Sequence, residues 1–283
     1  MGQVINLLVW DDAVQEVALE ITLESPVLAL RINHSKLAVC LLHAIHVFLF
    51  GSQGCVKLGS VETRANPRGL CQLSPDANQE LLVFPARKTG AVQILELAGL
   101  STDSSTSPVT VNAHESEIAA LALNLHGTLL ATGSQLGTLV RVWDTRTRLK
   151  LMELRRGSDP ASLQGLVFSP DSAFLAVSSD KATLHIFAVR HKAPNRKSLL
   201  QQVGIVTEEA ARSLAQVSLP TASPPAIAFP SPGVVLAVCL DGTYHKWKFT
   251  TDTGAVRQAF DLYLQVAEDA QFWHVPPAKS AGS

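Results

Sequence analysis

The chain alternates between short hydrophobic runs and polar turns along almost its whole length. Runs of aliphatic, β-branched and aromatic residues recur about every 40 to 60 residues, a period typical of a repeated sheet unit. These runs share a four-residue pattern whose last residue is Trp10, Phe48, Leu95, Trp143, Phe187 or Trp247. Residues of these types favour β-strands. The pattern therefore predicts a protein built from repeated β-sheets, in which helices are scarce.

Each repeat contains more than one predicted strand. A second run of small and aliphatic residues precedes most of the first set, at Leu37–Leu42, Leu81–Phe84, Leu129–Thr132, Phe174–Ser178 and Val234–Cys239. Turn residues between the two runs indicate hairpins. A third alternating run lies upstream, at Val27–Ile32, Gly69–Leu73, Ile118–Leu123, Leu163–Phe168 and Pro225–Phe229. A fourth, outer strand is predicted at Ala13–Leu23, Lys57–Thr63, Lys150–Arg155 and Leu214–Leu219.

Sheets of this kind bury both faces only when they stack around an axis. We therefore predict an all-β fold, a single β-propeller domain over residues 1–270 with about five full blades and a partial one. Residues 190–222 form an unusually long connection after the run that ends at Phe187, and such loops are usually functional or disordered. Within it, Thr207–Gln216 is predicted to form a short helix. Residues 271–283 are predicted to be a disordered tail.

Composition excludes two classes of function. The chain is 47% hydrophobic and 17% charged, which is too apolar for a disordered polyelectrolyte. Its formal net charge of -1 gives no long-range attraction for a nucleic acid, so any anion must be recognised by a local patch. The longest apolar stretch, Leu37–Phe50, is too short to span a bilayer and contains two histidines. We therefore expect a soluble protein whose membrane role, if it has one, is peripheral.

Motifs for catalysis and for metal binding are missing. The four cysteines form no CxxC pair, so the sequence indicates no zinc site, and reduced buried thiols suit the cytosol. The sequence contains no GxSxG, HExxH, P-loop or GxGxxG motif. We therefore predict that the protein is not an enzyme and needs no cofactor.

One repeat carries a more specific signature. It runs from His114 through Gly133-Ser134 to Trp143-Asp144, which resembles a WD repeat, and it is followed by Leu154-Arg155-Arg156-Gly157. Together with Asn66-Pro67-Arg68-Gly69 and other segments in order, this resembles the PROPPIN (WIPI) family of phosphoinositide-binding propellers, in the branch with Leu before the arginine pair. The resemblance implies a seven-bladed ring, of which this chain lacks the first blade and part of the second, so we expect it to be N-terminally truncated. Where the family usually has Gly in the sixth-blade hairpin, this chain has Ala182.

Two adjacent arginines suit two binding sites better than one. Neighbouring residues of an extended strand point to opposite sides, and each guanidinium can hold phosphate oxygens in a bidentate fork. We number the repeats by their place in the seven-bladed family ring. The fifth repeat, which contains Trp143, offers Arg155 the side chains of His114, Ser134, Thr138 and Arg141. The sixth repeat, which contains Phe187, offers Arg156 the side chains of Ser179, Lys181, Thr183 and His185. The resemblance implies that these are two sites for phosphatidylinositol 3-phosphate or the 3,5-bisphosphate. Two alternatives stay open: the arginine pair as a solvated face, and His114 as a structural histidine bonded within its blade.

The long connection after the sixth-blade strands supports a membrane interpretation. Its Arg196 and Lys197 would lie near an anionic leaflet, where each basic residue contributes about 1 kcal/mol. Leu199 and Leu200 would insert at the headgroup boundary. The alternative is a disordered charged loop. Because His114 and His185 ordinarily titrate near pH 6.5, binding is predicted to strengthen in mild acid.

The sequence thus favours a membrane-recruited scaffold in autophagy, with a WD-type protein-interaction platform without lipid binding as the alternative. The partners implied by the resemblance are 3-phosphorylated phosphoinositides and an autophagy lipid-transfer protein. We expect a monomer that is cytoplasmic, peripheral on preautophagosomal or endosomal membranes, and without affinity for nucleic acid.

Overall fold

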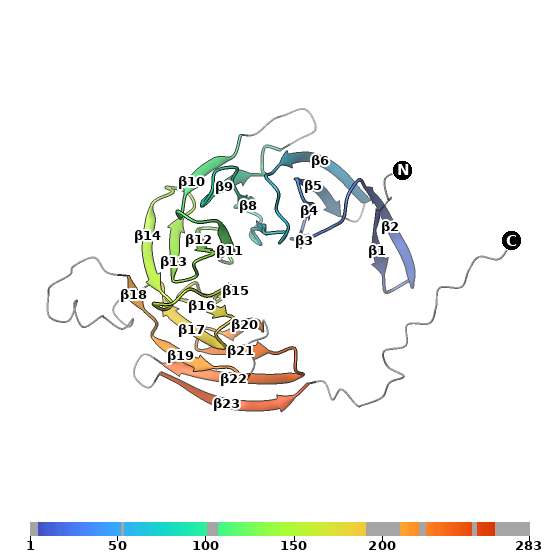
Figure 1. The fold of residues 1–283 in the computed structure, drawn as a ribbon. Coiled ribbons are helices and arrows are strands. Elements are labelled where there is room, and N and C mark those ends of the chain that lie inside the picture. Colours follow the sequence, from blue (N-terminus) through green and yellow to red (C-terminus); the bar gives the residue numbers. More distant parts are fainter. Residues whose placement is uncertain are drawn as a thin grey trace.

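The described chain is built from antiparallel β-sheets that follow one another around a ring. The computed structural model describes residues 5–51, 54–100, 107–190, 210–220, 225–250 and 254–263. Within these ranges there is no helix. Figure 1 shows the sheets arranged radially, with β1–β2 at one end of the series and β20–β23 at the other. This arrangement confirms the predicted all-β propeller fold.

Each complete sheet has its first strand near the centre of the ring and its fourth strand at the outer rim (Figure 1). The first strands are β3 (Ala29–Ile32), β7 (Gln72–Leu73), β11 (Ile118–Leu123), β15 (Leu163–Phe168) and β20 (Ala226–Ser231). The second strands are β4 (Lys36–Cys40), β8 (Leu81–Pro85), β12 (Leu129–Ser134), β16 (Phe174–Ser179) and β21 (Val234–Val238). The third strands are β5 (Ala44–Gly51), β9 (Ala91–Glu96), β13 (Leu139–Asp144), β17 (Thr183–Ala188) and β22 (Thr243–Thr250). The fourth strands are β6 (Gly54–Glu62), β10 (Val109–Asn112), β14 (Lys150–Arg155), β19 (Ala215–Ser218) and β23 (Gly254–Leu262).

Two further features complete the topology. At the N-terminal end, β1 (Ile5–Asp11) and β2 (Glu16–Leu23) form a separate two-stranded antiparallel sheet. Later in the chain, the two-residue strand β18 (Ala211–Arg212) adds in parallel to β14, the rim strand of the preceding sheet. The chain then returns to place β19 in the sheet of β15–β17.

The hydrophobic core is divided into one cluster per boundary between neighbouring sheets. Central strands supply both boundaries because successive side chains face opposite ways. On β16, Leu175 and Val177 pack in the cluster shared with β11–β14, while Ala176 packs in the cluster shared with β20–β23. A strand buried on both faces reads as a continuous apolar run, which is why these segments are so hydrophobic in sequence.

Two sequence expectations differ from the structure. The helix predicted over Thr207–Gln216 is wrong for its described part, which contains β18 and the start of β19. Ala215 and Val217 are buried while Gln216 and Ser218 are exposed, a period of two that suits a strand. Tertiary burial has therefore overridden the local helix propensity of the alanines. The rim strands β10 and β23 are absent from the predicted outer strands.

The hairpin between β16 and β17 contains the strained residue Ala182. Its φ is +52°, in the left-handed region that costs a residue with a Cβ about 1 to 2 kcal/mol. We expect Ala182→Gly to raise the free energy of unfolding by about 0.5 to 1 kcal/mol, because relief of this strain outweighs the added freedom of the unfolded chain. Urea denaturation measures it. Ala176→Gly, at a buried strand position without positive φ, should destabilise instead, and a loss of stability in Ala182→Gly would contradict the prediction.

Candidate functional site

The arginine pair lies where the rim strand β14 ends. Arg155 is its last residue, paired with Leu139 of β13 on one side and in parallel with Arg212 of β18 on the other. The next residue, Arg156, donates its backbone N–H to the carbonyl of Thr138 at 2.9 Å. Strand geometry thus continues through the pair, and it sends the two side chains to opposite sides.

The guanidinium of Arg156 is held against backbone carbonyls rather than carboxylates. The residue is 7% exposed, its Nε donates to the Gly137 carbonyl at 2.7 Å, and its Nη2 donates to the Asp159 carbonyl. Burial lowers the pKa of Arg156, although Asp180 and Asp159 act in the opposite direction. These bonds use two of the five N–H groups of a guanidinium. Arg156 is therefore a fixed cation, still charged at cellular pH.

The sixth-blade partners predicted for Arg156 gather around the β16–β17 hairpin. Ser179 and Thr183 are register partners across it, with their hydroxyl oxygens 3.5 Å apart, and Lys181 is exposed at its tip. His185 is buried on β17, and its Nδ1 lies 3.3 Å from the hydroxyl of Ser213. Burial first, and then the charge of Arg156, lower the pKa of His185 to about 4. The structure thus brings Arg156 within electrostatic reach of His185.

The fifth-blade partners predicted for Arg155 are largely engaged within their own blade. The Nε2 of His114 lies 3.0 Å from the Thr132 hydroxyl, which also accepts the Trp143 indole N–H at 3.0 Å. This network favours the structural reading of His114. Burial and the charge of Arg141 lower the pKa of His114 to about 4.

Arg141 is likewise committed. Its Nε donates to Oε2 of Glu153 at 2.8 Å, and its Nη1 donates to the carbonyl of Ala113 at 2.6 Å. Ser134 is buried at the end of β12, and Thr138 is half-buried in the turn just before β13. Within the described residues no hydrogen bond or ion pair joins any of this group to Arg155.

Arg155 itself has an unsatisfied donor. Its Nε is buried and has no hydrogen-bond partner among the described residues. In addition, Arg155 and Arg212 stand side by side as register partners of two parallel strands, so two like charges are neighbours. An unpaired buried donor beside a second cation is an unfavourable arrangement that a bound anion would relieve. The sequence interpretation missed Arg212 and Ser213, since both lie in the segment predicted to be helical.

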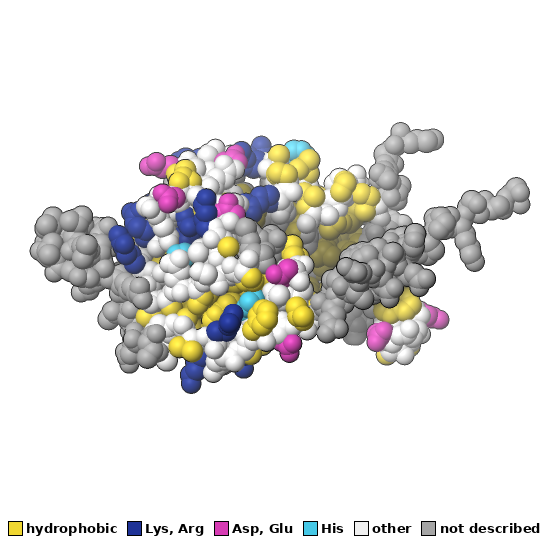
Figure 2. Space-filling model, turned by 60° about the horizontal axis from the view of Figure 1, so that its bottom comes forward, with side chains coloured by type: hydrophobic (Ala, Val, Ile, Leu, Met, Phe, Trp, Pro, Cys, Tyr) yellow, Lys and Arg dark blue, Asp and Glu magenta, His cyan; other side chains and the backbone are white. Residues whose placement is uncertain are grey.

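The predicted membrane-insertion residues cannot be placed in the structure. Arg196, Lys197, Leu199 and Leu200 lie outside the described residues. On the described surface, Lys and Arg side chains gather in the left half of the face in Figure 2. Within the described residues no helix is long and apolar enough to cross a membrane, and no group of His, Cys, Asp or Glu is arranged to hold a metal ion.

The histidine pKa values correct one expectation. Because His114 and His185 have a pKa of about 4, both imidazoles are neutral from pH 7.5 to 5.5 in the unliganded protein. The predicted strengthening of binding in mild acid therefore loses its basis. The physical reason is burial, which disfavours the charged imidazolium. Among the described residues no carboxylate acts on His185 to offset this effect.

The same values predict acid instability. In the unfolded chain these histidines titrate near 6.5, so between pH 6.5 and 4 the unfolded state binds more protons and stability falls as pH falls. We expect the free energy of unfolding to drop by about 1 to 2 kcal/mol per histidine from pH 7 to pH 5. Urea denaturation at the two pH values measures this drop. His185→Gln should show a smaller drop than the unmodified chain, and an equal drop would refute the assignment.

Comparisons with known proteins place this geometry in a family. The PROPPIN family model matches residues 13–200. Ectopic P granules protein 6 of Caenorhabditis elegans is 36% identical over 96% of this chain and 72% of its own length, and autophagy-related protein 18e of Arabidopsis thaliana is 32% identical over 86% and 65%. Among solved structures, Hsv2p of Kluyveromyces lactis superposes with a TM-score of 0.74 at 26% identity, over 91% of this chain and 80% of that one.

The match extends over most of the chain, although the relatives are longer. This chain spans between 45% and 72% of the length of six curated relatives that it matches. The family model alone covers the sheets from β2 to β17, including the arginine pair and both flanking hairpins. The repeated four-stranded sheets, the Leu154-Arg155-Arg156-Gly157 segment and these matches lead to one conclusion: the chain belongs to the PROPPIN family.

Proposed function

We propose that this chain binds 3-phosphorylated phosphoinositides at the end of β14 and serves as a membrane-recruited scaffold in autophagy. The observation that carries the proposal is the environment of Arg155, whose Nε is buried without an acceptor next to the second cation Arg212. A phosphate monoester offers three acceptor oxygens and nearly two negative charges at pH 7. Such a group would satisfy the donor and separate the like charges.

A second phosphate site is proposed around Arg156. The neighbouring hairpin carries the hydroxyl groups of Ser179 and Thr183 and the exposed ammonium of Lys181, and the charge of Arg156 reaches His185. Hydroxyl donors and cations suit a phosphate on a polyhydroxy ring. Phosphatidylinositol 3-phosphate and the 3,5-bisphosphate are the proposed ligands, on either side of Arg155 and Arg156. At the first site His114 and Arg141 would act mainly by shaping the wall, because both already have partners.

Two sites on one rim would act together on a membrane. Both arginines lie at one end of β14, so two headgroups in the same leaflet are reached at once and avidity multiplies two weak contacts. We propose that residues 190–222 add to this, with Arg196 and Lys197 near anionic lipids and Leu199 and Leu200 at the headgroup boundary. The chain would act as a single propeller domain over residues 1–270.

The cellular role rests on the relatives. One match is named autophagy-related protein 18e, and this supports a role of this chain on preautophagosomal or endosomal membranes, peripheral and reached from the cytoplasm. We propose that it works as a monomer without cofactor or catalysis, and that an autophagy lipid-transfer protein is among its partners.

Vesicle flotation tests the lipid part of this proposal. Phosphatidylcholine vesicles that contain phosphatidylinositol 3-phosphate or the 3,5-bisphosphate should carry the chain upward in a density gradient. Vesicles with phosphatidylinositol, or with the 4-phosphate at the same charge, should carry little. Equal flotation with the 3-phosphate and the 4-phosphate would show that only charge is read and would contradict the proposal.

A protein-interaction platform without lipid binding is the second candidate. The His114–Thr132–Trp143 network and the Arg141–Glu153 ion pair favour it, because they show two predicted lipid ligands serving the fold. It predicts no phosphoinositide-dependent flotation at all.

A further inference from the structure

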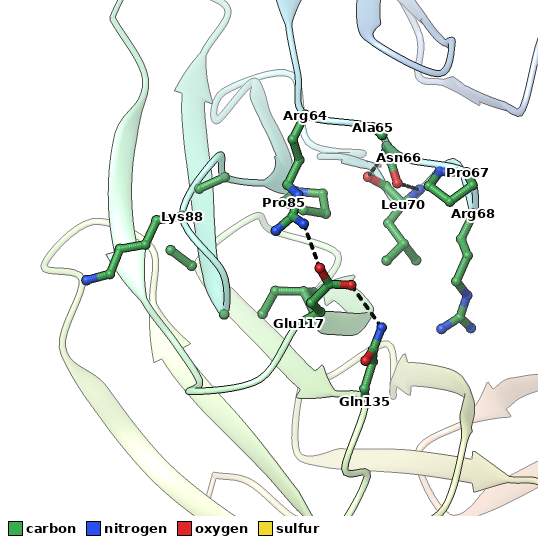
Figure 3. A pocket seen from close by; sticks show the side chains of 14 residues that line it. Arg64, Ala65, Asn66, Pro67, Arg68, Leu70, Pro85, Lys88, Glu117 and Gln135 are labelled. Carbon is green, nitrogen blue, oxygen red and sulfur yellow. Dashed lines mark hydrogen bonds and ion pairs between the residues drawn. The ribbon is translucent and has the colours of Figure 1, made fainter.

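A second recognition feature lies away from the arginine pair, on the loops that enter β7 and β11. It is a hollow of about 100 Å3. The connection before β7 and the β8–β9 hairpin form two of its walls, and Glu117 and Gln135 form its floor (Figure 3). All these segments lie at the same end of their strands, so they meet on one face of the ring.

The floor of the hollow is a neutralised carboxylate. Glu117 accepts a hydrogen bond from Nη2 of Arg64 at 2.6 Å through Oε1, and from Nε2 of Gln135 at 2.9 Å through Oε2. The Arg64 and Glu117 side chains are 34% and 44% exposed, so solvent and a ligand can reach both. The ion pair is therefore half-open, not sealed in the core.

Two further cations border the hollow without a carboxylate partner among the described residues. Arg68 has one hydrogen bond there, from Nη2 to the Leu163 carbonyl at 3.3 Å, and Lys88 is exposed on the hairpin. In Figure 3, Arg64 and Arg68 extend from the two ends of the Asn66–Pro67 turn, and Lys88 points outward at the rim. The lining thus holds three cations and one carboxylate, a local positive excess in a chain whose net charge is -1.

The walls of the hollow are held rigidly before any ligand arrives. The Asn66 side chain is buried and bonds both backbone groups of Leu70, accepting from its N–H at 3.0 Å and donating to its carbonyl at 3.1 Å. On the facing hairpin, Gly90 has a φ of +72° and a Cβ there would lie 1.8 Å from the His114 carbonyl oxygen. A preorganised wall lowers the entropy cost of binding. About half of this lining is apolar, from Ala65, Pro67, Leu70, Pro85, Ala86, Ala91 and Ile118.

We propose that this hollow binds an acidic side chain of an extended peptide segment in a partner protein, together with an aliphatic side chain two residues away, on the same face of the segment. A guanidinium fork matches a carboxylate, and Arg68 and Lys88 supply charge that no described acid neutralises. The apolar half of the lining fits this aliphatic side chain, whereas a free phosphate has no apolar group to place there. This site shares no residue with the lipid sites proposed above.

The probe is the fluorescein-labelled hexapeptide Ser-Leu-Ser-Glu-Ser-Leu, which places Leu and Glu on one face when it is extended, measured by fluorescence polarisation against the full chain. Replacing both Arg68 and Lys88 by Gln should weaken binding at least fivefold. Arg87→Gln is the matched control, because Arg87 is exposed on the same hairpin but pairs with Glu62 outside the hollow, and it should change binding less than twofold. If the control weakens binding as much as the double variant, the site assignment is wrong.

Glu117→Gln gives the sharpest test. It removes the competing carboxylate, so the acidic peptide should bind about fivefold more tightly, whereas a merely structural ion pair would give equal or weaker binding. A peptide with Lys in place of Glu should not bind. If inositol 1,3-bisphosphate displaces the acidic peptide with the same dependence on Arg68 and Lys88, the site is a general anion site and the peptide proposal fails. Arg155→Thr with Arg156→Thr should retain peptide binding, so failure of the lipid proposal leaves this result separate.

Discussion

Replacing Arg155 and Arg156 together by threonine is expected to abolish flotation with vesicles that contain phosphatidylinositol 3-phosphate. Each guanidinium would supply charge-assisted hydrogen bonds to one phosphate, and such bonds contribute about 1.5 to 3 kcal/mol each. Loss of one site already weakens its headgroup contact about tenfold or more. Loss of both also removes avidity, so the affinity for the membrane should fall at least 100-fold. Single variants should retain intermediate binding, because one site of the two remains.

A charge-matched control separates lipid recognition from general charge. Arg146→Thr with Lys150→Thr removes two cations near the start of β14, at the opposite end of the strand from the pair. These residues are exposed, and the control should retain binding within about threefold while leaving the fold intact. If the control loses binding like the double arginine variant, or if the double variant still floats, the proposed site at the end of β14 is wrong.

Gly137→Ala should cause the largest loss of stability among single substitutions at the site. Gly137 has a φ of +64°, and a Cβ there would lie 1.7 Å from the carbonyl oxygen of Ala161 in the segment leading to β15. Overpacking costs about 1 to 3 kcal/mol and the left-handed conformation costs about 1 to 2 kcal/mol. We expect a loss of about 3 kcal/mol or more, measured by urea denaturation, because the backbone must shift and carry the carbonyl that accepts from Arg156 with it.

Gly157→Ala is the matched control for this prediction. Gly157 directly follows the arginine pair, its φ is not positive, and no atom lies within 4 Å of the Cβ that alanine would add. Its stability should stay within about 0.5 kcal/mol of the unmodified chain. If both glycine variants are equally stable, close approach of the β12–β13 hairpin to the next sheet is not what makes Gly137 necessary.

Much of the fold was predictable from the sequence because the repeat pattern depends on burial. Residues such as Leu175, Ala176 and Val177 must all be apolar when a strand is covered on both faces, and that run is visible without a structure. That Arg155 and Arg156 point to opposite sides stays a prediction from the same strand geometry.

What the sequence did not reveal depends on contacts between distant segments. Nothing local indicates that Arg141 pairs with Glu153 across β13 and β14, or that Arg212 lies beside Arg155. The alanines around Arg212 favour a helix in isolation, and only the free edge of β14 makes a strand the better solution there. The histidine pKa values likewise depend on burial that develops when neighbouring sheets stack.

The excursion of β18 onto the neighbouring sheet has a mechanical meaning. After β17 the backbone pairs through β18 with Leu154 and Arg155 of the neighbouring sheet, and it then returns as β19 to complete the sheet of β15–β17. This strand exchange should resist a hinge motion between the two sheets, because separating them would break main-chain hydrogen bonds as well as apolar contacts. The two phosphate sites proposed beside Arg155 and Arg156 would therefore lie between sheets that cannot easily move apart.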